Sequence, residues 1–150
     1  MLERALGAIL LIALGVLLYW GWQRWQLRRA ATSGLAGLEA RQPGVAAILY
    51  FTTPTCVPCR TVQRPALASL AETFGERLQI ITIDATERPD VADHWGVLTI
   101  PTTFVFDPSG TPLACNMGVA NAAKLLGQLE AAGLERPQTQ PVATRPVLEK

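Results

Sequence analysis

Apolar residues in the middle of the chain form blocks whose lengths alternate between those of strands and those of helices. A continuous apolar run occupies Val45–Phe51, and a run of this length suits a strand that is buried on both faces. A second, mostly apolar segment of strand length occupies Leu78–Ile83. Between them, from Cys56 to Phe74, apolar positions recur at helical spacing. Pro65 lies inside this pattern, and a proline within a helix removes a backbone donor. The pattern predicts a buried strand, a helix kinked at Pro65, and a second apolar strand ending at Asp84.

The next part of the chain predicts a hairpin between two helices. In chain order, we expect a short helix at Arg88–Trp95, a turn and strand at Thr99–Phe106, a tight turn at Asp107–Gly110, a strand at Pro112–Met117 and a helix at Asn121–Ala132. We also expect Gly118 to bulge the last strand. A helical crossover makes the first two strands parallel, whereas a tight turn makes the last two antiparallel. The fold class is thus α/β, with a central mixed sheet flanked by helices.

A longer apolar block lies at the N-terminus, where residues 5–22 contain no charged side chain. A helix of this length reaches about 27 Å, close to the thickness of the hydrocarbon layer of a bilayer. Aromatic side chains cluster at its end, as they do at membrane–water boundaries. They are Tyr19, Trp20, Trp22 and Trp25. A cleaved signal peptide and a buried core helix are the alternatives to the interpretation that we prefer, one transmembrane anchor over residues 1–23.

Arginines flank this apolar block unequally. Arg4 precedes it, whereas Arg24, Arg28 and Arg29 follow it. Because the more basic flank of a membrane span stays on the cytoplasmic side, the rest of the chain is expected to face the cytoplasm. The sequence therefore predicts a single-pass membrane protein with a cytoplasmic globular domain, and an extracytoplasmic domain is the alternative.

Composition divides the rest of the chain into three parts. Residues 24–41 are polar and then small, which predicts a juxtamembrane linker, and residues 42–134 carry the predicted strands and helices. Residues 135–150 are rich in Pro, Thr and Gln and are expected to form a disordered tail. The 150 residues carry a net charge of +1 and no basic patch interleaved with aromatic residues, which argues against a nucleic-acid partner.

Two cysteines, Cys56 and Cys59, stand at the predicted start of the helix that follows the first strand. A helix N-terminus has unpaired N–H groups and partial positive charge, which stabilise an anion. The pKa of a cysteine at such a site falls from about 8.5 toward about 7 or below, so we expect a reactive thiolate at Cys56. Cys59 lies one turn deeper on the same helix face, within reach for disulfide exchange. Half of a zinc site and two inert helix cysteines are the alternatives.

Other residues with chemical potential favour structural roles. Cys115 falls in the last predicted strand and is interpreted as a small buried hydrophobic residue. His94 is interpreted as a surface or capping residue. The acidic residues Glu87, Asp90 and Asp93 are interpreted as a solvated helix face. Three cysteines and one histidine without metal-like spacing predict no metal site.

Four features, taken in order, resemble the thioredoxin family over roughly residues 42–134. They are the apolar strand that runs into Cys56-Val57-Pro58-Cys59-Arg60, the strand that ends in Ile83-Asp84, the segment from Trp95-Gly96-Val97 to Ile100-Pro101-Thr102, and Gly118 before the last helix. The resemblance implies a thioredoxin-like fold and a thiol–disulfide oxidoreductase. It implies Cys56 as the nucleophile and Cys59 as the resolving thiol, with no cofactor beyond this redox-active pair.

The resemblance also implies a substrate site beside the cysteines. It gives the peptide bond before Pro101 a cis conformation that faces the cysteine pair, so that the backbone of Ile100 can pair with an extended substrate. Thr55, Val57 and Pro58 complete the expected substrate-binding residues. The expected partners are protein or small-molecule disulfides and thiols, together with the membrane.

The chain departs from the family pattern at several positions. Tyr50 stands where the family carries a buried acid, Thr55 stands where it carries Trp, and Pro65 lies one place later than usual. We expect net reduction of protein disulfides at the membrane, because the cytoplasm favours the dithiol form. The alternatives are a membrane-tethered binding module without turnover and, for an outward-facing domain, an exported oxidant or isomerase.

Overall fold

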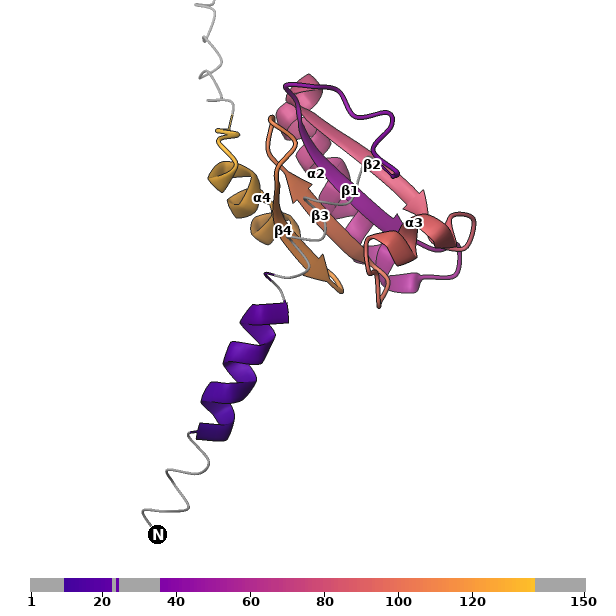
Figure 1. The fold of residues 1–150 in the computed structure, drawn as a ribbon. Helices are drawn as coiled ribbons and strands as arrows, with labels where there is room; N and C mark the ends of the chain where they lie inside the picture. Colours follow the sequence, from indigo (N-terminus) through magenta and orange to yellow (C-terminus); the bar gives the residue numbers. More distant parts are fainter. Residues whose placement is uncertain (1–9, 23, 25–35, 137–150) are drawn as a thin grey trace, which may run out of the picture.

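The computed structural model describes residues 10–22, 24 and 36–136 (Figure 1). Residues 10–22 form a helix, and residues 36–136 form a sheet with helices on both of its faces. All of the predicted strands are present. The four strands of the sheet are β1 (Ala46–Thr52), β2 (Leu78–Asp84), β3 (Thr102–Phe106) and β4 (Pro112–Met117).

The sheet is mixed, with the strand order β2-β1-β3-β4. β1 pairs in parallel with β2 and antiparallel with β3, and β3 pairs antiparallel with β4. The predicted mixed α/β sheet is therefore confirmed. The expectation that Gly118 bulges β4 is wrong, because the irregular register lies between Val105 and Phe106. Gly118 instead follows the end of β4, where its N–H donates to the carbonyl of Pro101 at 2.8 Å.

Helices cover both faces of the sheet. α2 (Arg64–Phe74) and α4 (Ala122–Ala131) contact each other and bury their apolar side chains against one face, whereas α3 (Pro89–His94) covers the other. β1 lies inside the sheet, and its side chains alternate between the two cores because successive residues of a strand point to opposite faces. Every residue of β1 is buried, as its continuous apolar run predicts.

The helix after β1 is irregular near the proline for which we predicted a kink. Residues 57–58 are helical, Cys59–Gln63 form a π-helical turn (η1), and α2 follows and runs into a 3₁₀ turn, η2 (Gly75–Arg77). Pro65 has no N–H to donate to the carbonyl four residues before it, as an α-helix requires. In the preceding π turn, the Arg64 N–H reaches back to the Cys59 carbonyl, one residue further than in an α-helical hydrogen bond.

Residues 36–41 pack against the sheet, ahead of the predicted domain boundary. Leu38 is buried among the side chains on the α3 face, and the Trp95 indole N–H donates to the Ala36 carbonyl at 2.7 Å. The Arg41 guanidinium donates to two carbonyls of the turn between β3 and β4. These contacts extend the folded unit to residue 36.

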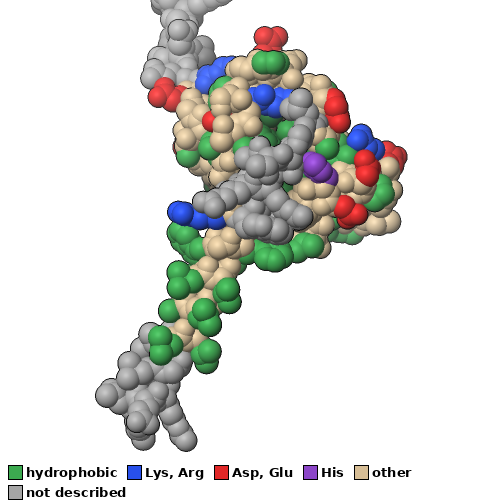
Figure 2. All heavy atoms as spheres, in the orientation of Figure 1, with side chains coloured by type: hydrophobic (Ala, Val, Ile, Leu, Met, Phe, Trp, Pro, Cys, Tyr) green, Lys and Arg blue, Asp and Glu red, His purple; other side chains and the backbone are tan. Residues whose placement is uncertain are grey.

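The helix of residues 10–22 carries exposed apolar side chains along its length (Figure 2). Among the residues that the structure describes, no helix combines the length and the apolar character that a membrane crossing requires. Residues 1–9 and 23 of the predicted anchor lie outside the described residues. So do residues 25–35 of the predicted linker and residues 137–150 of the predicted tail.

Candidate redox-active site

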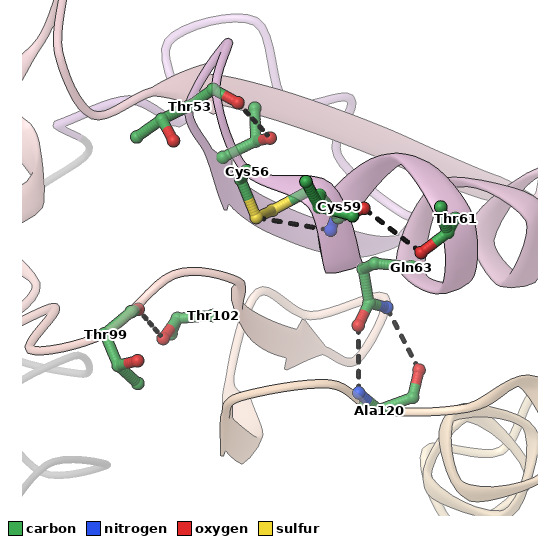
Figure 3. Close-up of a disulfide and its surroundings, with 10 residues drawn as sticks. Thr53, Cys56, Cys59, Thr61, Gln63, Thr99, Thr102 and Ala120 are labelled. Carbon is green, nitrogen blue, oxygen red and sulfur yellow. Dashed lines mark hydrogen bonds between the residues drawn. A yellow bond between two sulfur atoms is a disulfide. The ribbon is translucent and has the colours of Figure 1, made fainter.

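Cys56 and Cys59 form a disulfide where β1 leads into the helix (Figure 3). The S–S distance is 2.03 Å, and the two Cα atoms are 5.3 Å apart. Cys56 is half-buried, whereas Cys59 is fully buried in the core between β1, α2 and α4. A partner molecule can therefore reach Cys56 but not Cys59, which is the asymmetry that a nucleophile and a resolving thiol require.

The sulfur of Cys56 lies at the N-terminus of the helix. Cys56 directly precedes the first helical residue, and the Cys59 N–H donates to the Cys56 Sγ at 3.2 Å. This N–H belongs to the first turn, where backbone donors have no partner within the helix. The sulfur thus takes the place of an N-cap oxygen, and the helix dipole adds partial positive charge around it. The same arrangement stabilises a thiolate at Cys56 once the disulfide is reduced.

The turn before β3 faces the disulfide across the site (Figure 3). Its Ile100–Pro101 peptide bond is cis, as the resemblance implies. Ile100 packs against the same buried cluster as Cys56. The Thr102 hydroxyl donates to the Thr99 carbonyl at 2.7 Å and closes the turn around the cis bond. Ile100 also packs against the buried cluster on the α3 face, so this turn contacts the cores on both sides of the sheet.

The expected substrate-binding residues differ in their exposure. Thr55, Val57 and Pro58 are exposed beside the half-buried sulfur, Ile100 is half-buried and Pro101 is buried. Sequence reasoning missed three exposed apolar residues, of which one lies shortly before Pro101 in the chain and two flank Gly118. They are Leu98, Met117 and Val119, with exposed fractions of 70%, 38% and 44%. No sequence pattern marks them, because an apolar residue in a turn or strand is equally compatible with burial.

Gln63 connects the cysteine-bearing helix to the loop before α4. Its side chain is fully buried, its Nε2 donates to the Ala120 carbonyl at 3.0 Å, and its Oε1 accepts from the Ala120 N–H at 2.9 Å (Figure 3). That loop begins at Gly118, whose N–H donates a hydrogen bond to the Pro101 carbonyl. Sequence reasoning also missed Gln63, because a glutamine at a helical position usually indicates a solvated face.

Cys115 and the charged candidates lie outside this arrangement. Cys115 packs on the α3 face of the sheet, opposite the disulfide, and burial raises its pKa to about 11. His94 is exposed at the end of α3, as are Glu87, Asp90 and Asp93 on and before that helix. Within residues 10–22, 24 and 36–136, no group of three or more His, Cys, Asp or Glu side chains could hold a metal ion.

The chemistry of the site follows from the asymmetry of its two sulfurs. The reachable sulfur can exchange with a disulfide of another molecule, and its buried neighbour can then close the cycle. The electrons are held by the protein's own sulfurs, so the reaction needs no cofactor. The class of protein that this arrangement defines is a thiol–disulfide oxidoreductase.

Sequence comparison gives the family. The thioredoxin family profile matches residues 39–131, and the chain belongs to this family. Thioredoxin 1 of Synechococcus elongatus is 27% identical over 77 residues, which cover 51% of this chain and 71% of that protein. Thioredoxin of Bacillus subtilis is 38% identical over 55 residues, which cover 37% of this chain and 52% of that protein. The chain thus matches only part of each relative's length.

Solved structures show the same fold. Chloroplastic thioredoxin z superposes with a TM-score of 0.56 at 24% identity, over 66% of this chain and 85% of that one. Mitochondrial thioredoxin 3 of Saccharomyces cerevisiae, in its oxidized form, superposes with a TM-score of 0.52 at 22% identity, over 60% of this chain and 81% of that one. At these identities the likeness concerns the fold alone.

Proposed function

We propose that this protein reduces disulfides of other proteins, with Cys56 as the nucleophile and Cys59 as the resolving thiol, from a domain tethered to the cytoplasmic face of a membrane. The position of Cys56 carries the proposal. Its half-buried sulfur accepts an N–H of the first helical turn and is bonded to a second, buried sulfur. A protein that only binds its partner has no need for such a pair.

In each step of the proposed cycle, one S–S bond forms while another breaks, and the electrons balance. The Cys56 thiolate attacks one sulfur of the substrate disulfide, the substrate S–S bond breaks, and the departing sulfur takes a proton from water. The Cys59 thiolate then attacks the Cys56 sulfur, which re-forms the Cys56–Cys59 disulfide and releases the second substrate thiolate. Two electrons pass from the protein to the substrate, and a dithiol reductant must restore the protein.

The surface around Cys56 suits an extended protein segment. Thr55, Val57 and Pro58 are exposed next to Cys56 in the chain, and Ile100 directly precedes the cis proline. A substrate strand can add to such a backbone by main-chain hydrogen bonds, while its side chains contact the apolar surroundings. This geometry supports protein disulfides as the main substrates.

The membrane tether is supported by the sequence and by the exposure of the first helix. Residues 5–22 carry no charge, and Leu10, Leu17 and Trp20 are 70%, 69% and 59% exposed. The arginine excess after the apolar block favours a cytoplasmic domain. Cytoplasmic conditions keep thiols reduced, which favours net reduction of substrates.

Insulin reduction by the full chain in detergent micelles, with dithiothreitol as the electron donor, tests the activity. We expect Cys56→Ser to abolish turnover and Cys115→Ser, the matched control, to retain it. Cys59→Ser should accumulate mixed disulfides between Cys56 and the substrate. An unmodified protein that reduces insulin no faster than dithiothreitol alone would contradict the proposal and favour a binding module.

Thiol labelling in intact cells tests the orientation. After reduction, a membrane-impermeant maleimide should reach Cys56 only when the cells are permeabilised, and Cys56→Ser identifies the labelled residue. Prompt labelling of unpermeabilised cells would place the domain outside and favour an exported oxidant or isomerase.

A further inference from the structure

A buried amide side chain holds the loop between β4 and α4. Both polar groups of the Gln63 side chain are paired with the backbone of Ala120 (Figure 3): Nε2 donates to its carbonyl at 3.0 Å, and Oε1 accepts from its N–H at 2.9 Å. Both residues are fully buried, so these hydrogen bonds are shielded from water. A backbone that is held through its donor and its acceptor at once has a fixed position and orientation.

A polar side chain is an exception among the buried residues of this helix. The buried residues of α2, which follows directly, are all apolar; they are Ala66, Leu67, Leu70 and Phe74. An apolar residue would also fill position 63, and it would not require the costly transfer of an amide from water to the core. Packing alone therefore does not explain a glutamine here, and the connection to Ala120 is what the glutamine adds.

The loop that Gln63 holds connects the two sides of the redox-active site. On one side, Gln63 ends the π-helical turn that begins with Cys59, which is disulfide-bonded to Cys56. On the other side, the Gly118 N–H donates to the Pro101 carbonyl at 2.8 Å, next to the cis peptide bond. A short series of bonds thus runs from the sulfur pair through Gln63 and this loop to the turn before β3.

An extended protein substrate needs both sides of the site at once. In the proposed function, its sulfur reaches Cys56 while its backbone pairs with that of Ile100 in the turn before β3. A displacement of about 1 Å between two such contacts can slow a reaction about 100-fold. A disulfide without a peptide backbone needs only Cys56. The position of the loop relative to the cysteines therefore matters for protein substrates and not for small ones.

We propose that Gln63 is a positioning residue, which holds the loop of residues 118–120, and through it the turn around Pro101, in register with Cys56 for an extended protein substrate. The inference rests on the proposed function, because it concerns substrate binding before the first step of that cycle. Both polar groups of Gln63 are engaged by Ala120, so the residue acts through the loop and leaves the exchange of sulfur bonds unchanged. Gln63 thus sets the preference for protein disulfides over small ones.

Gln63→Met tests the proposal, because it keeps the length of the side chain and removes both hydrogen bonds. The reduced full chain in detergent micelles, carrying Cys115→Ser, is mixed with increasing concentrations of insulin. Acid quenching and mass spectrometry follow the oxidation of the Cys56–Cys59 pair and give a half-saturating concentration and a limiting rate. We expect Gln63→Met to raise the half-saturating insulin concentration about tenfold and to leave the limiting rate unchanged. The rate of oxidation by bis(2-hydroxyethyl) disulfide, which has no peptide group, should stay the same.

Two further variants separate positioning from stability. Leu129 is fully buried in α4, and Leu129→Ala destabilises the protein without removing a hydrogen bond of Ala120, so its insulin curve should match that of the unmodified protein. Gln63→Asn keeps an amide that can reach Ala120 through a water molecule. It should raise the half-saturating insulin concentration severalfold, and it replaces Gln63→Met if that variant does not fold. All proteins are compared at a temperature at which thermal unfolding shows them to be folded.

Unchanged insulin curves for the Gln63 variants overturn the proposal. So does an equal slowing with insulin and with the small disulfide, because it would place the effect on the cysteines. An equal rise of the half-saturating concentration in Leu129→Ala also overturns it, because lost stability would then be the cause. In these three cases insulin still oxidises the unmodified protein, and the proposed function stands. An unmodified protein that insulin does not oxidise contradicts the proposed function, and the inference with it.

Discussion

The paired hydrogen bonds of Gln63 make a quantitative prediction about stability. Replacing Gln63 by methionine keeps the length of the side chain and removes both bonds to the Ala120 backbone, which are 2.9 and 3.0 Å long. Gln63 and Ala120 are both fully buried. Water cannot replace the lost partner there without entering the core.

The expected loss follows from the two backbone groups that remain unpaired. A buried donor or acceptor that loses its partner costs about 1–3 kcal/mol. Two such groups are affected, and the apolar methionine offsets part of the cost by its burial. We therefore expect Gln63→Met to lower the free energy of unfolding by about 2–4 kcal/mol, a large share of the roughly 5–15 kcal/mol typical of a domain.

Gln79 provides a matched control on the surface. Its Oε1 accepts from the Gln42 N–H and its Nε2 donates to the Ala40 carbonyl, both at 2.8 Å and both exposed to solvent. Gln79→Met removes the same two kinds of hydrogen bond, but water can replace them. We expect it to cost about 0–1 kcal/mol.

Urea unfolding of the oxidised full chain in detergent micelles measures both variants. Trp95 is buried, and its fluorescence reports unfolding once Trp20, Trp22 and Trp25 are replaced by phenylalanine in every protein compared. Equal denaturant slopes are required for the midpoints to be read as stabilities. If Gln63→Met lowers the free energy of unfolding no more than Gln79→Met does, burial does not increase the contribution of these hydrogen bonds to stability, and the reasoning is refuted.

Three further predictions concern single residues. Burial acts to raise the pKa of Asp107, but hydrogen bonds from the Ser109 hydroxyl and from backbone N–H groups outweigh it and hold that pKa below its ordinary value. A lowered folded-state pKa stabilises the protein above the unfolded pKa of about 3.9 and loses this effect as the pH falls through the folded value. Asp107→Asn should therefore lower stability at pH 7 by less than about 1 kcal/mol, since the group is partly exposed, and the difference in urea midpoint should narrow below about pH 4. Burial raises the pKa of Cys115 to about 11. Iodoacetamide at neutral pH should therefore label Cys56 of the reduced native protein and leave Cys115 unlabelled until urea is added. Mass spectrometry of the peptides shows which cysteine carries the label. Asn121 caps α4 by accepting the Lys124 N–H at 2.9 Å, and Asn121→Ala should cost about 1 kcal/mol by urea unfolding, whereas no measurable loss would show that the cap is replaced by water.

The strands could be predicted from sequence because their apolar residues form compact runs. The run at Val45–Phe51 is β1 with its bounds shifted by one residue, and the predicted strand at Pro112–Met117 is β4. Residues 36–41 could not be assigned to the fold in this way. Leu38 is buried through contacts with side chains distant in the chain, and one large apolar residue among small and charged neighbours is too little to define a period.

The candidate site was predictable where its residues are close in sequence. The spacing of Cys56 and Cys59 places one sulfur at a helix N-terminus, and the structure has this geometry. The resemblance implied the cis bond before Pro101, which the sequence alone does not distinguish from an ordinary trans bond. Tyr50 buries its hydroxyl without a hydrogen-bond partner among the described residues, and this could not be predicted, because it depends on which groups the fold encloses around it.

Pro65 and the buried Gln63 lie in or next to one irregular turn of the helix. Pro65 lies one place later than the family pattern places it, and the turn over Cys59–Gln63 spans one residue more than an α-helical turn. After this wider turn, α2 buries its apolar residues against the sheet. The same turn contains Gln63, which is buried against the Ala120 backbone. Gln63 thus joins the irregular turn after Cys59 to the loop before α4, and Gly118 of that loop is hydrogen-bonded to the Pro101 carbonyl. A substitution that changes the conformation of the turn should therefore also change the conformation of the loop.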